Sequence, residues 1–198
     1  MARDVAIEVE SASAMVVRAL SEARDESRDG RWRFALGDLV SGQEMDVVLH
    51  LNFPLGRAGQ AVDARISVRD RDGVLGGRET VAWEYADHPA NDRQPRNRVV
   101  DRAVARLYAA RARREALELN RMGRYDEATS LLASVRRRIE SYAGDDLELL
   151  RIVESLRVEF RVYAEPMTPM DRKMRYSEAS YVLRNRDAGG MARREKIR

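Results

Sequence analysis

The sequence of 198 residues contains no cysteine, two histidines and twelve aromatic residues. Without cysteine the chain forms no disulfide framework, thiolate nucleophile or cysteine-based zinc site, and two histidines cannot supply a histidine-rich metal cage. No apolar run approaches the roughly 20 residues that a membrane-spanning helix needs, and the N-terminus lacks the apolar segment of a signal peptide. We therefore expect a soluble, cytoplasmic protein with no membrane insertion, metal or other cofactor.

The charge of the chain is unevenly distributed. Residues 1–92 carry 11 basic and 17 acidic side chains, a net charge of −6, and residues 93–198 carry 25 and 16, a net charge of +9. The overall value of +3 conceals this difference. The hydrophobic period changes at the same place, which favours two modules over a single domain.

Apolar and polar residues alternate through the first half, which is the pattern of half-buried strands. Turns such as Asp29-Gly30 and Asp72-Gly73 separate the alternating stretches. The stretches are Val5–Val9, Met15–Leu20, Trp32–Leu36, Met45–Phe53, Val62–Val68 and Val81–Tyr85. They predict an antiparallel β-sandwich of about six strands over residues 1–88. Since sandwiches usually have about seven strands or more, an open edge could bind an upstream segment or a partner.

From about residue 97 the apolar period is 3.6, which predicts four helices. The first ends near Gly123 and the second near Gly144, because glycine is a common residue after a helix end. Asp145 or Asp146 caps the third, and Thr168 followed by Pro169 starts the fourth. The expected inward-facing residues of the last two helices are Leu149, Ile152, Val153, Leu156 and Phe160, then Met170, Met174 and Tyr181.

The predicted fold class is therefore α+β, with the sandwich followed by a four-helix bundle. A linker over residues 89–98 contains Pro89 and Pro95, and the bundle extends over residues 99–186. The remaining residues 187–198 are mostly basic with little to bury, and we expect a flexible tail.

The motifs indicate no reaction. The glycine-rich run from Gly73 to Gly77 lacks the Lys-Ser or Lys-Thr of a phosphate loop and is interpreted as a hairpin loop. Residues 25–29 are similar to an Asp-x-Ser-x-Ser metal loop but end in Asp, and we interpret them as a solvated loop. Neither His50 nor His88 has a catalytic partner at a suggestive spacing. We expect no catalytic residue and no enzymatic activity.

Arginine supplies 34 of the 36 basic residues, and its clusters in the second half are candidates for an interaction surface. These candidates are Arg113, Arg114, Arg136, Arg137, Arg138, Arg184 and Arg186. Clustered cations contact phosphates, which would make nucleic acid or another polyanion the partner. Neighbouring helical acids can instead pair with the same arginines. Both interpretations stay open.

One stretch resembles a tetratricopeptide-type helical hairpin. Residues 112–135 combine small alanines with Gly123 at the turn, so that two helices can approach closely. Such solenoids normally need about three stacked repeats. Because a single copy is visible, we expect this hairpin to pack on its helical neighbours.

A wider resemblance covers residues 2–186. The N-terminal stretch from Ala2, the Gly37-Asp38-Leu39 to Gly42 turn with its following strand, the Gly123-Arg-Tyr-Asp-Glu-Ala hairpin and the helix from Asp171 carry it. In this order they resemble the region after the A domain in bacterial von Willebrand factor A domain proteins. The metal-binding A domain itself is absent. The resemblance implies a non-enzymatic scaffold that binds a protein partner or an adjacent A domain, and it leaves the oligomeric state open.

Overall fold

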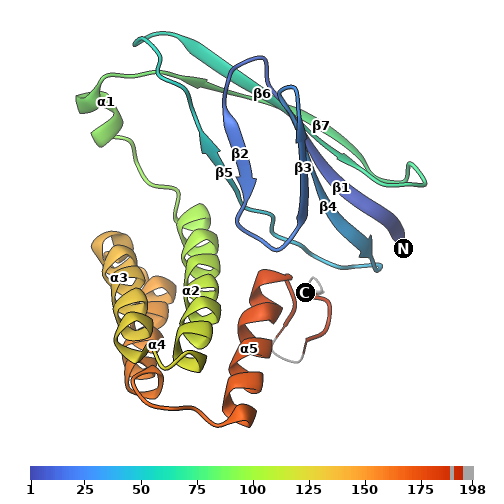
Figure 1. The fold of residues 1–198 in the computed structure, drawn as a ribbon. Helices are drawn as coiled ribbons and strands as arrows, with labels where there is room; N and C mark the ends of the chain where they lie inside the picture. Colours follow the sequence, from blue (N-terminus) through green and yellow to red (C-terminus); the bar gives the residue numbers. More distant parts are fainter. Residues whose placement is uncertain (188–189, 194–198) are drawn as a thin grey trace. The chain divides into compact units, whose positions relative to one another are not determined.

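The computed structural model describes residues 1–187 and 190–193, which divide into two compact units before and after Asn97. The first unit contains antiparallel β-sheets and one short helix, and the second contains four long helices that pack together (Figure 1). The predicted α+β fold class is therefore confirmed.

Seven strands form two sheets in the described part of the first unit. Their bounds are β1 (Ala2–Glu10), β2 (Val16–Ala19), β3 (Arg24–Arg28), β4 (Arg31–Leu39), β5 (Leu49–Asn52), β6 (Ala61–Arg69) and β7 (Gly76–Glu84). The larger sheet has the order β3-β4-β1-β6-β7, and β2 pairs with β5 in the smaller one. All pairs are antiparallel.

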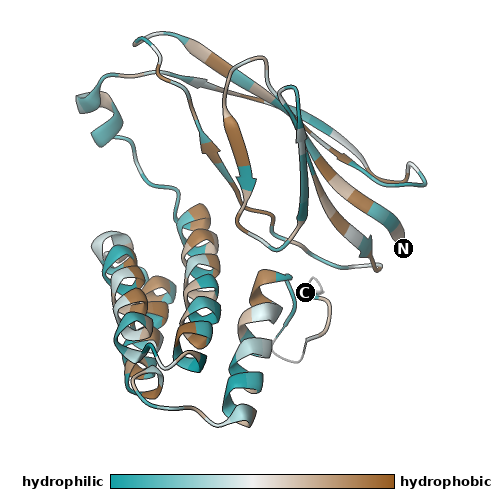
Figure 2. Ribbon diagram, in the orientation of Figure 1, coloured by the Kyte–Doolittle hydropathy of each residue, from teal (hydrophilic) through white to brown (hydrophobic). Residues whose placement is uncertain are grey.

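The core of this unit lies between the two sheets. Cross-strand partners share a face of a sheet, so Val9 on β1 lies beside Trp32 on β4. These residues and Phe34 pack with Met15 and Val17 of the segment that forms β2. Figure 2 shows the resulting alternation of hydrophobic and hydrophilic positions along the strands.

Two details of the β prediction are wrong. Residues 25–29 are not a solvated loop, because Arg24–Arg28 is the strand β3, which joins β4 through a turn at Asp29 and Gly30. The strand predicted over Met45–Phe53 is shorter, since only Leu49–Asn52 pairs with β2. The Gly73–Gly77 prediction holds in part: a turn follows Asp70, and β7 already begins at Gly76.

The helices begin and end close to the predicted residues. Their bounds are α1 (His88–Asp92), α2 (Arg98–Arg121), α3 (Tyr125–Ala143), α4 (Leu147–Tyr163) and α5 (Pro169–Leu183). The Asp146 carboxylate accepts hydrogen bonds from the N–H groups of Glu148 and Leu149 at the start of α4. Thr168 Oγ1 accepts one from the Asp171 N–H at the start of α5. The short helix α1, which was not predicted, lies in the segment expected to be a linker.

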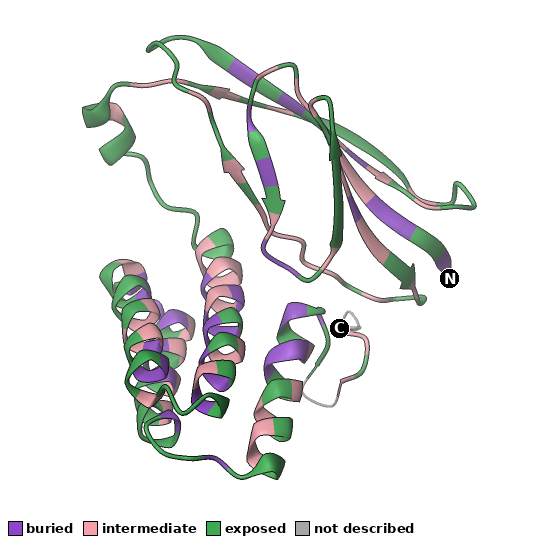
Figure 3. Cartoon of the chain, in the orientation of Figure 1, coloured by how far each residue is buried: buried purple, intermediate pink, exposed green. Residues whose placement is uncertain are grey.

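Helix α2 lies at the centre of the second unit and contacts α3, α4 and α5. Small residues permit this close packing: Ala105, Ala109, Ala112 and Ala116 are all buried along α2. Helix α5 buries Ala179, Ser180 and Leu183. Figure 3 shows the buried residues of α2 and α5 as purple bands on the helices.

The predicted inward faces of α4 and α5 are partly wrong. Phe160 is 44% exposed, and Met170 and Met174 are 72% and 53% exposed. Leu149, Val153 and Leu156 are buried as predicted. Helical spacing identifies a stripe of apolar residues, but it does not reveal which stripe a neighbouring helix covers.

Most of the predicted tail, residues 188–189 and 194–198, lies outside the described residues. Within the described part, Arg186 and Ala192 form an antiparallel bridge after α5. Over the described residues, no helix combines the length and the apolar character needed to cross a membrane.

Candidate interaction surfaces

Arg113, a predicted surface residue, lies between α2 and α4. Its Nε atom donates to Glu159 Oε2 at 2.7 Å, and its Nη2 atom donates to Glu159 Oε1 at 3.0 Å and Ser155 Oγ at 2.8 Å. The side chains of Arg113 and Glu159 are about one-fifth exposed. Because bidentate pairing fixes the relative geometry of the two side chains as well as pairing their charges, Arg113 links α2 to α4.

Several other predicted arginines also have partners within their unit. Arg136 donates to Glu140 at 2.8 Å, Arg138 lies over the Tyr108 ring at 5.9 Å, and Arg186 donates to the Gly190 carbonyl at 2.8 Å. Arg114 and Arg184 have partners as well. Arg137 is exposed. Binding of a partner through these arginines stays a prediction.

Substitutions of Arg113 and Arg137 test whether Arg113 stabilises the helical unit while Arg137 is only a surface residue. We expect Arg113→Ala to lower the free energy of unfolding of the helical unit by about 1–3 kcal/mol, because Glu159 loses its charged donor. The matched substitution Arg137→Ala removes an exposed side chain and should change it by about 0.5 kcal/mol or less. Urea unfolding followed by far-ultraviolet circular dichroism measures both values. Equal effects would contradict the assignment.

The beginning of α4 carries a second polar contact between α2 and α4. Burial raises the pKa of Asp146, but hydrogen bonds from Arg102 and the Leu149 and Glu148 N–H groups outweigh burial and hold the pKa below its ordinary value. Arg102 Nε donates to Asp146 Oδ2 at 2.9 Å. The negative charge lies at the helix N-terminus, where the helix dipole also favours it. This aspartate therefore has a structural role.

The outer face of the five-stranded sheet is densely charged. Cross-strand partners share a face, so the register assigns its members. Its arginines are Arg24, Arg28, Arg31, Arg33, Arg65, Arg69 and Arg78, and its acidic residues are Glu8, Glu10, Glu26, Asp63 and Glu84. Glu10 lies 3.5 Å from Arg31 and 3.6 Å from Arg65, and Glu8 lies 3.0 Å from Arg69. These three cross-strand ion pairs link β1 to β4 and β6.

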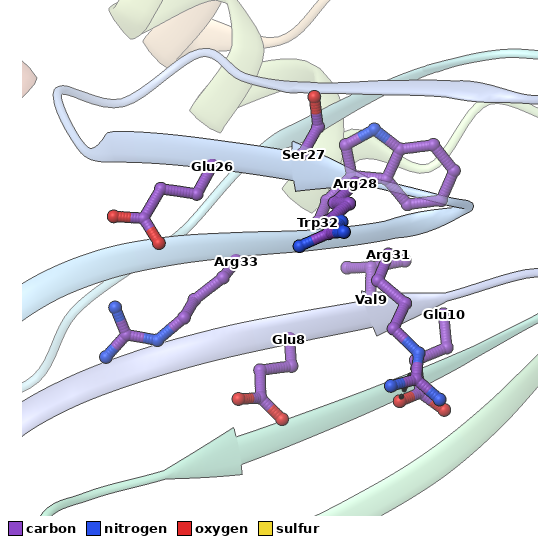
Figure 4. Close-up of a pocket in the computed structure, with 9 residues that line it drawn as sticks. All are labelled: Glu8, Val9, Glu10, Glu26, Ser27, Arg28, Arg31, Trp32 and Arg33. Carbon is purple, nitrogen blue, oxygen red and sulfur yellow. Dashed lines mark ion pairs between the residues drawn. The ribbon is translucent and has the colours of Figure 1, made fainter.

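A pocket of about 390 Å³ lies where β1, β3 and β4 meet. Figure 4 shows that its lining alternates glutamate and arginine side chains, including the Arg31–Glu10 pair. The apolar members are Val9 and Trp32, and Ser27 is the one hydroxyl in the lining. Across the residues described, no group of three or more His, Cys, Asp or Glu side chains could hold a metal ion. Charged side chains thus make up most of the lining, and Arg31 pairs there with Glu10.

An exposed apolar stripe runs along α4. Leu147, Leu150, Val158 and Val162 are exposed and lie on one side of the helix by their spacing. Arg151, Glu154 and Arg161 lie among them. Apolar patches with polar rims mark protein interfaces, and this α4 stripe is therefore a candidate contact surface.

The open edges of the sheets are a second candidate surface. The five-stranded sheet ends at β3 on one side and β7 on the other, and β6 lies between β1 and β7. The backbone hydrogen-bonding groups of an edge strand are free on one side. The described residues form seven strands rather than the six predicted, so the expectation of a missing strand does not hold, and binding at an open edge stays a prediction.

The fold matches part of a known protein. No family model and no curated protein matches the sequence. A solved structure described as von Willebrand factor type A from Catenulispora acidiphila shares the fold with a TM-score of 0.55 and 15% sequence identity. The match covers 92% of this chain and 46% of that one. This chain thus spans less than half the length of the protein that it resembles in structure.

Proposed function

We propose that this chain is a non-enzymatic interaction module that accompanies a von Willebrand factor A domain. The observation that carries the proposal is the match of nearly the whole chain to less than half of a von Willebrand factor type A protein. More than half of that protein lies outside the matched region. An A domain, in the same polypeptide or encoded beside it, is the partner that this relationship favours.

The surfaces described above support a binding role. The α4 stripe presents four apolar side chains on one side of the helix, and burying them against a partner would be favourable. The polar pocket between β1, β3 and β4 contains paired charges, and an activated nucleophile beside a base is not among its lining residues. We propose that the α4 stripe is the contact surface for the A domain.

A direct binding measurement tests this function. The A domain encoded in the same reading frame or in an adjoining one is titrated with this chain by calorimetry. We expect saturable binding that weakens about tenfold or more in the double variant Leu150→Glu, Val158→Glu, because two charges would be buried in an apolar contact. Val99→Glu is the matched control, since Val99 is also exposed but lies on α2.

The possible outcomes separate the candidate functions. Loss of binding in the double variant but not in the control supports the α4 stripe as the contact. No binding by the unmodified chain, or no A domain encoded in either place, overturns the proposal. Retention on heparin in moderate salt together with no A-domain binding would favour polyanion binding instead, since phosphate-like contacts depend steeply on salt.

A further inference from the structure

Strand β7 is a long, uninterrupted open edge. Among the described strands it pairs with β6 alone, and its register runs from Gly76 to Glu84 without a bulge. The strand has nine residues and contains no proline. The other edge, β3, has five residues that are all polar and exposed, as protected edges commonly are. Of these two edges, β7 is therefore the better template for a further strand.

The backbone of β7 has a fixed direction of hydrogen bonding. The Tyr85 N–H donates to the Gln60 carbonyl, and the Gly59 N–H donates to the Tyr85 carbonyl, so the polar groups of Tyr85 point toward the β6 side. In an antiparallel ladder these directions alternate along the strand. The N–H and C=O groups of Glu84, Ala82, Thr80 and Arg78 consequently point to the open edge.

The side chains at these four positions have charges that allow β7 to pair with β7 of a second copy. Arg78 and Glu84 have opposite charges, lie on the same face of the sheet and are equally distant from Val81. Neither side chain forms an ion pair with another described residue. We propose that β7 pairs antiparallel with β7 of a second copy of this chain, centred on Val81, so that Arg78 of each copy lies opposite Glu84 of the other.

The alternation of the backbone restricts the possible registers. Centring on Val81 pairs Thr80 with Ala82 and Arg78 with Glu84, so every pair joins two residues with outward-pointing groups. A centre between two neighbouring residues would instead place residues whose N–H and C=O groups point to the open edge opposite residues whose groups point toward β6. Centring on Thr80 would pair Arg78 with Ala82, so that neither Arg78 nor Glu84 would lie opposite a residue of opposite charge. Opposite charges directly across a ladder are stabilising, which favours the register centred on Val81.

The other face of the strand fits the same register. The two copies of Val81 form a pair without mutual hydrogen bonds, in which side chains approach most closely. Trp83 lies on this face and contacts Phe53, with ring centroids 5.1 Å apart. The contact would join two five-stranded sheets into one continuous sheet. This inference does not depend on the proposed function, because it concerns another strand and another partner.

Charge reversal tests the register. The full chain is examined by analytical ultracentrifugation from micromolar to submillimolar concentration, and we expect a reversible dimer. Arg78→Glu and Glu84→Arg should each raise the dimer dissociation constant about tenfold or more, because the two symmetric pairs become like-charged. The double variant Arg78→Glu, Glu84→Arg should restore the original value, since it only exchanges the two positions.

Two further variants complete the test. Arg18→Glu applies the same charge change on β2, where the exposed Arg18 lies outside the proposed contact, and it should leave the dissociation constant unchanged. Thr80→Pro removes an N–H at the open edge and should weaken the dimer, because proline cannot donate to a ladder. A monomer at every concentration, or a dimer that neither single charge reversal weakens, would overturn the proposal. Circular dichroism verifies that each variant is folded.

Discussion

Replacing Tyr163 by alanine is expected to lower the free energy of unfolding of the helical unit by about 3–5 kcal/mol, the range for truncating a large aromatic residue in a core. Tyr163 is fully buried at the end of α4 and has the largest side chain among the fully buried residues. It packs in one cluster with residues of α2, α3 and α4. A cavity at this position would therefore weaken three helices together.

The hydroxyl group of Tyr163 has a different expected contribution from its ring. Its Oη atom is buried and has no hydrogen-bond partner among the described residues. Burial, together with the nearby Glu159 charge, raises the pKa of Tyr163 to about 12. The ring lies 5.9 Å from the Arg175 guanidinium, a contact that phenylalanine would keep. Tyr163→Phe should therefore leave stability unchanged or raise it by about 1 kcal/mol.

A control substitution on α4 distinguishes the loss of core packing from a general effect of truncating an aromatic residue to alanine. Phe160→Ala removes an aromatic ring that is 44% exposed, so the loss should be clearly smaller than for Tyr163→Ala. Urea unfolding followed by far-ultraviolet circular dichroism, which helices dominate, measures all three variants. Similar losses for Phe160→Ala and Tyr163→Ala would contradict the observed orientation of α4.

The helix boundaries could be predicted because they depend on local chemistry. Asp146 and Thr168 each satisfy N–H groups within three residues of their own position. Gly144, which follows α3, has the positive φ that favours glycine. None of these contacts needs knowledge of the tertiary fold, so the sequence contains the necessary information.

The inward faces of the helices depend on distant residues and were harder to predict. Phe160 and Met170 are more hydrophobic than the alanines of α2, yet Ala109 and Ala116 form the buried contact. Small residues let helix backbones approach, and the hydrophobicity of one segment does not record this advantage. The neighbour determines the buried face, and that neighbour lies far away in the sequence.

Strand β3 shows a different limit of sequence analysis. All its residues are exposed, so neither of its faces produces the alternation that identifies a half-buried strand. Its pairing with β4 and the turn at Asp29-Gly30 maintain it instead. Asp-Gly dipeptides are typical of hairpin turns. This signal favours a strand before the turn, whereas the similarity to a metal loop favours a loop.

The candidate surfaces also combine features that are visible in the sequence with features that depend on the tertiary fold. Arginine clusters are visible in the sequence, but the pairing of Arg113 with Glu159 depends on the packing of α2 against α4. The count of about six strands predicted an edge opened by a missing strand, whereas the described residues form seven strands and the larger sheet has two edges, at β3 and β7. The location of an edge at β7 requires the order of the sheet, in which β1 separates β4 from β6. Non-local strand pairing is therefore the information that the sequence pattern lacks.

Replacing Phe34 by alanine is expected to destabilise the β unit by about 3–5 kcal/mol. Phe34 is completely buried on β4, opposite Ile7 of β1 and Asp25 of β3. It packs in the cluster that includes Met15 and Val17, so it joins the two sheets. Small domains are stable by about 5–15 kcal/mol, and this single change would remove a large part of that stability.

Tryptophan fluorescence measures this effect selectively, because both tryptophans of the chain, Trp32 and Trp83, lie in the β unit. Trp32 belongs to the same core cluster as Phe34, so its emission should respond directly to loss of the core. Leu55→Ala is the control, since Leu55 is fully exposed and should change stability by about 0.5 kcal/mol or less. Phe34→Leu nearly conserves volume and should cost below about 1.5 kcal/mol. If Phe34→Ala costs no more than Phe34→Leu, Phe34 does not occupy the centre of the core between the sheets.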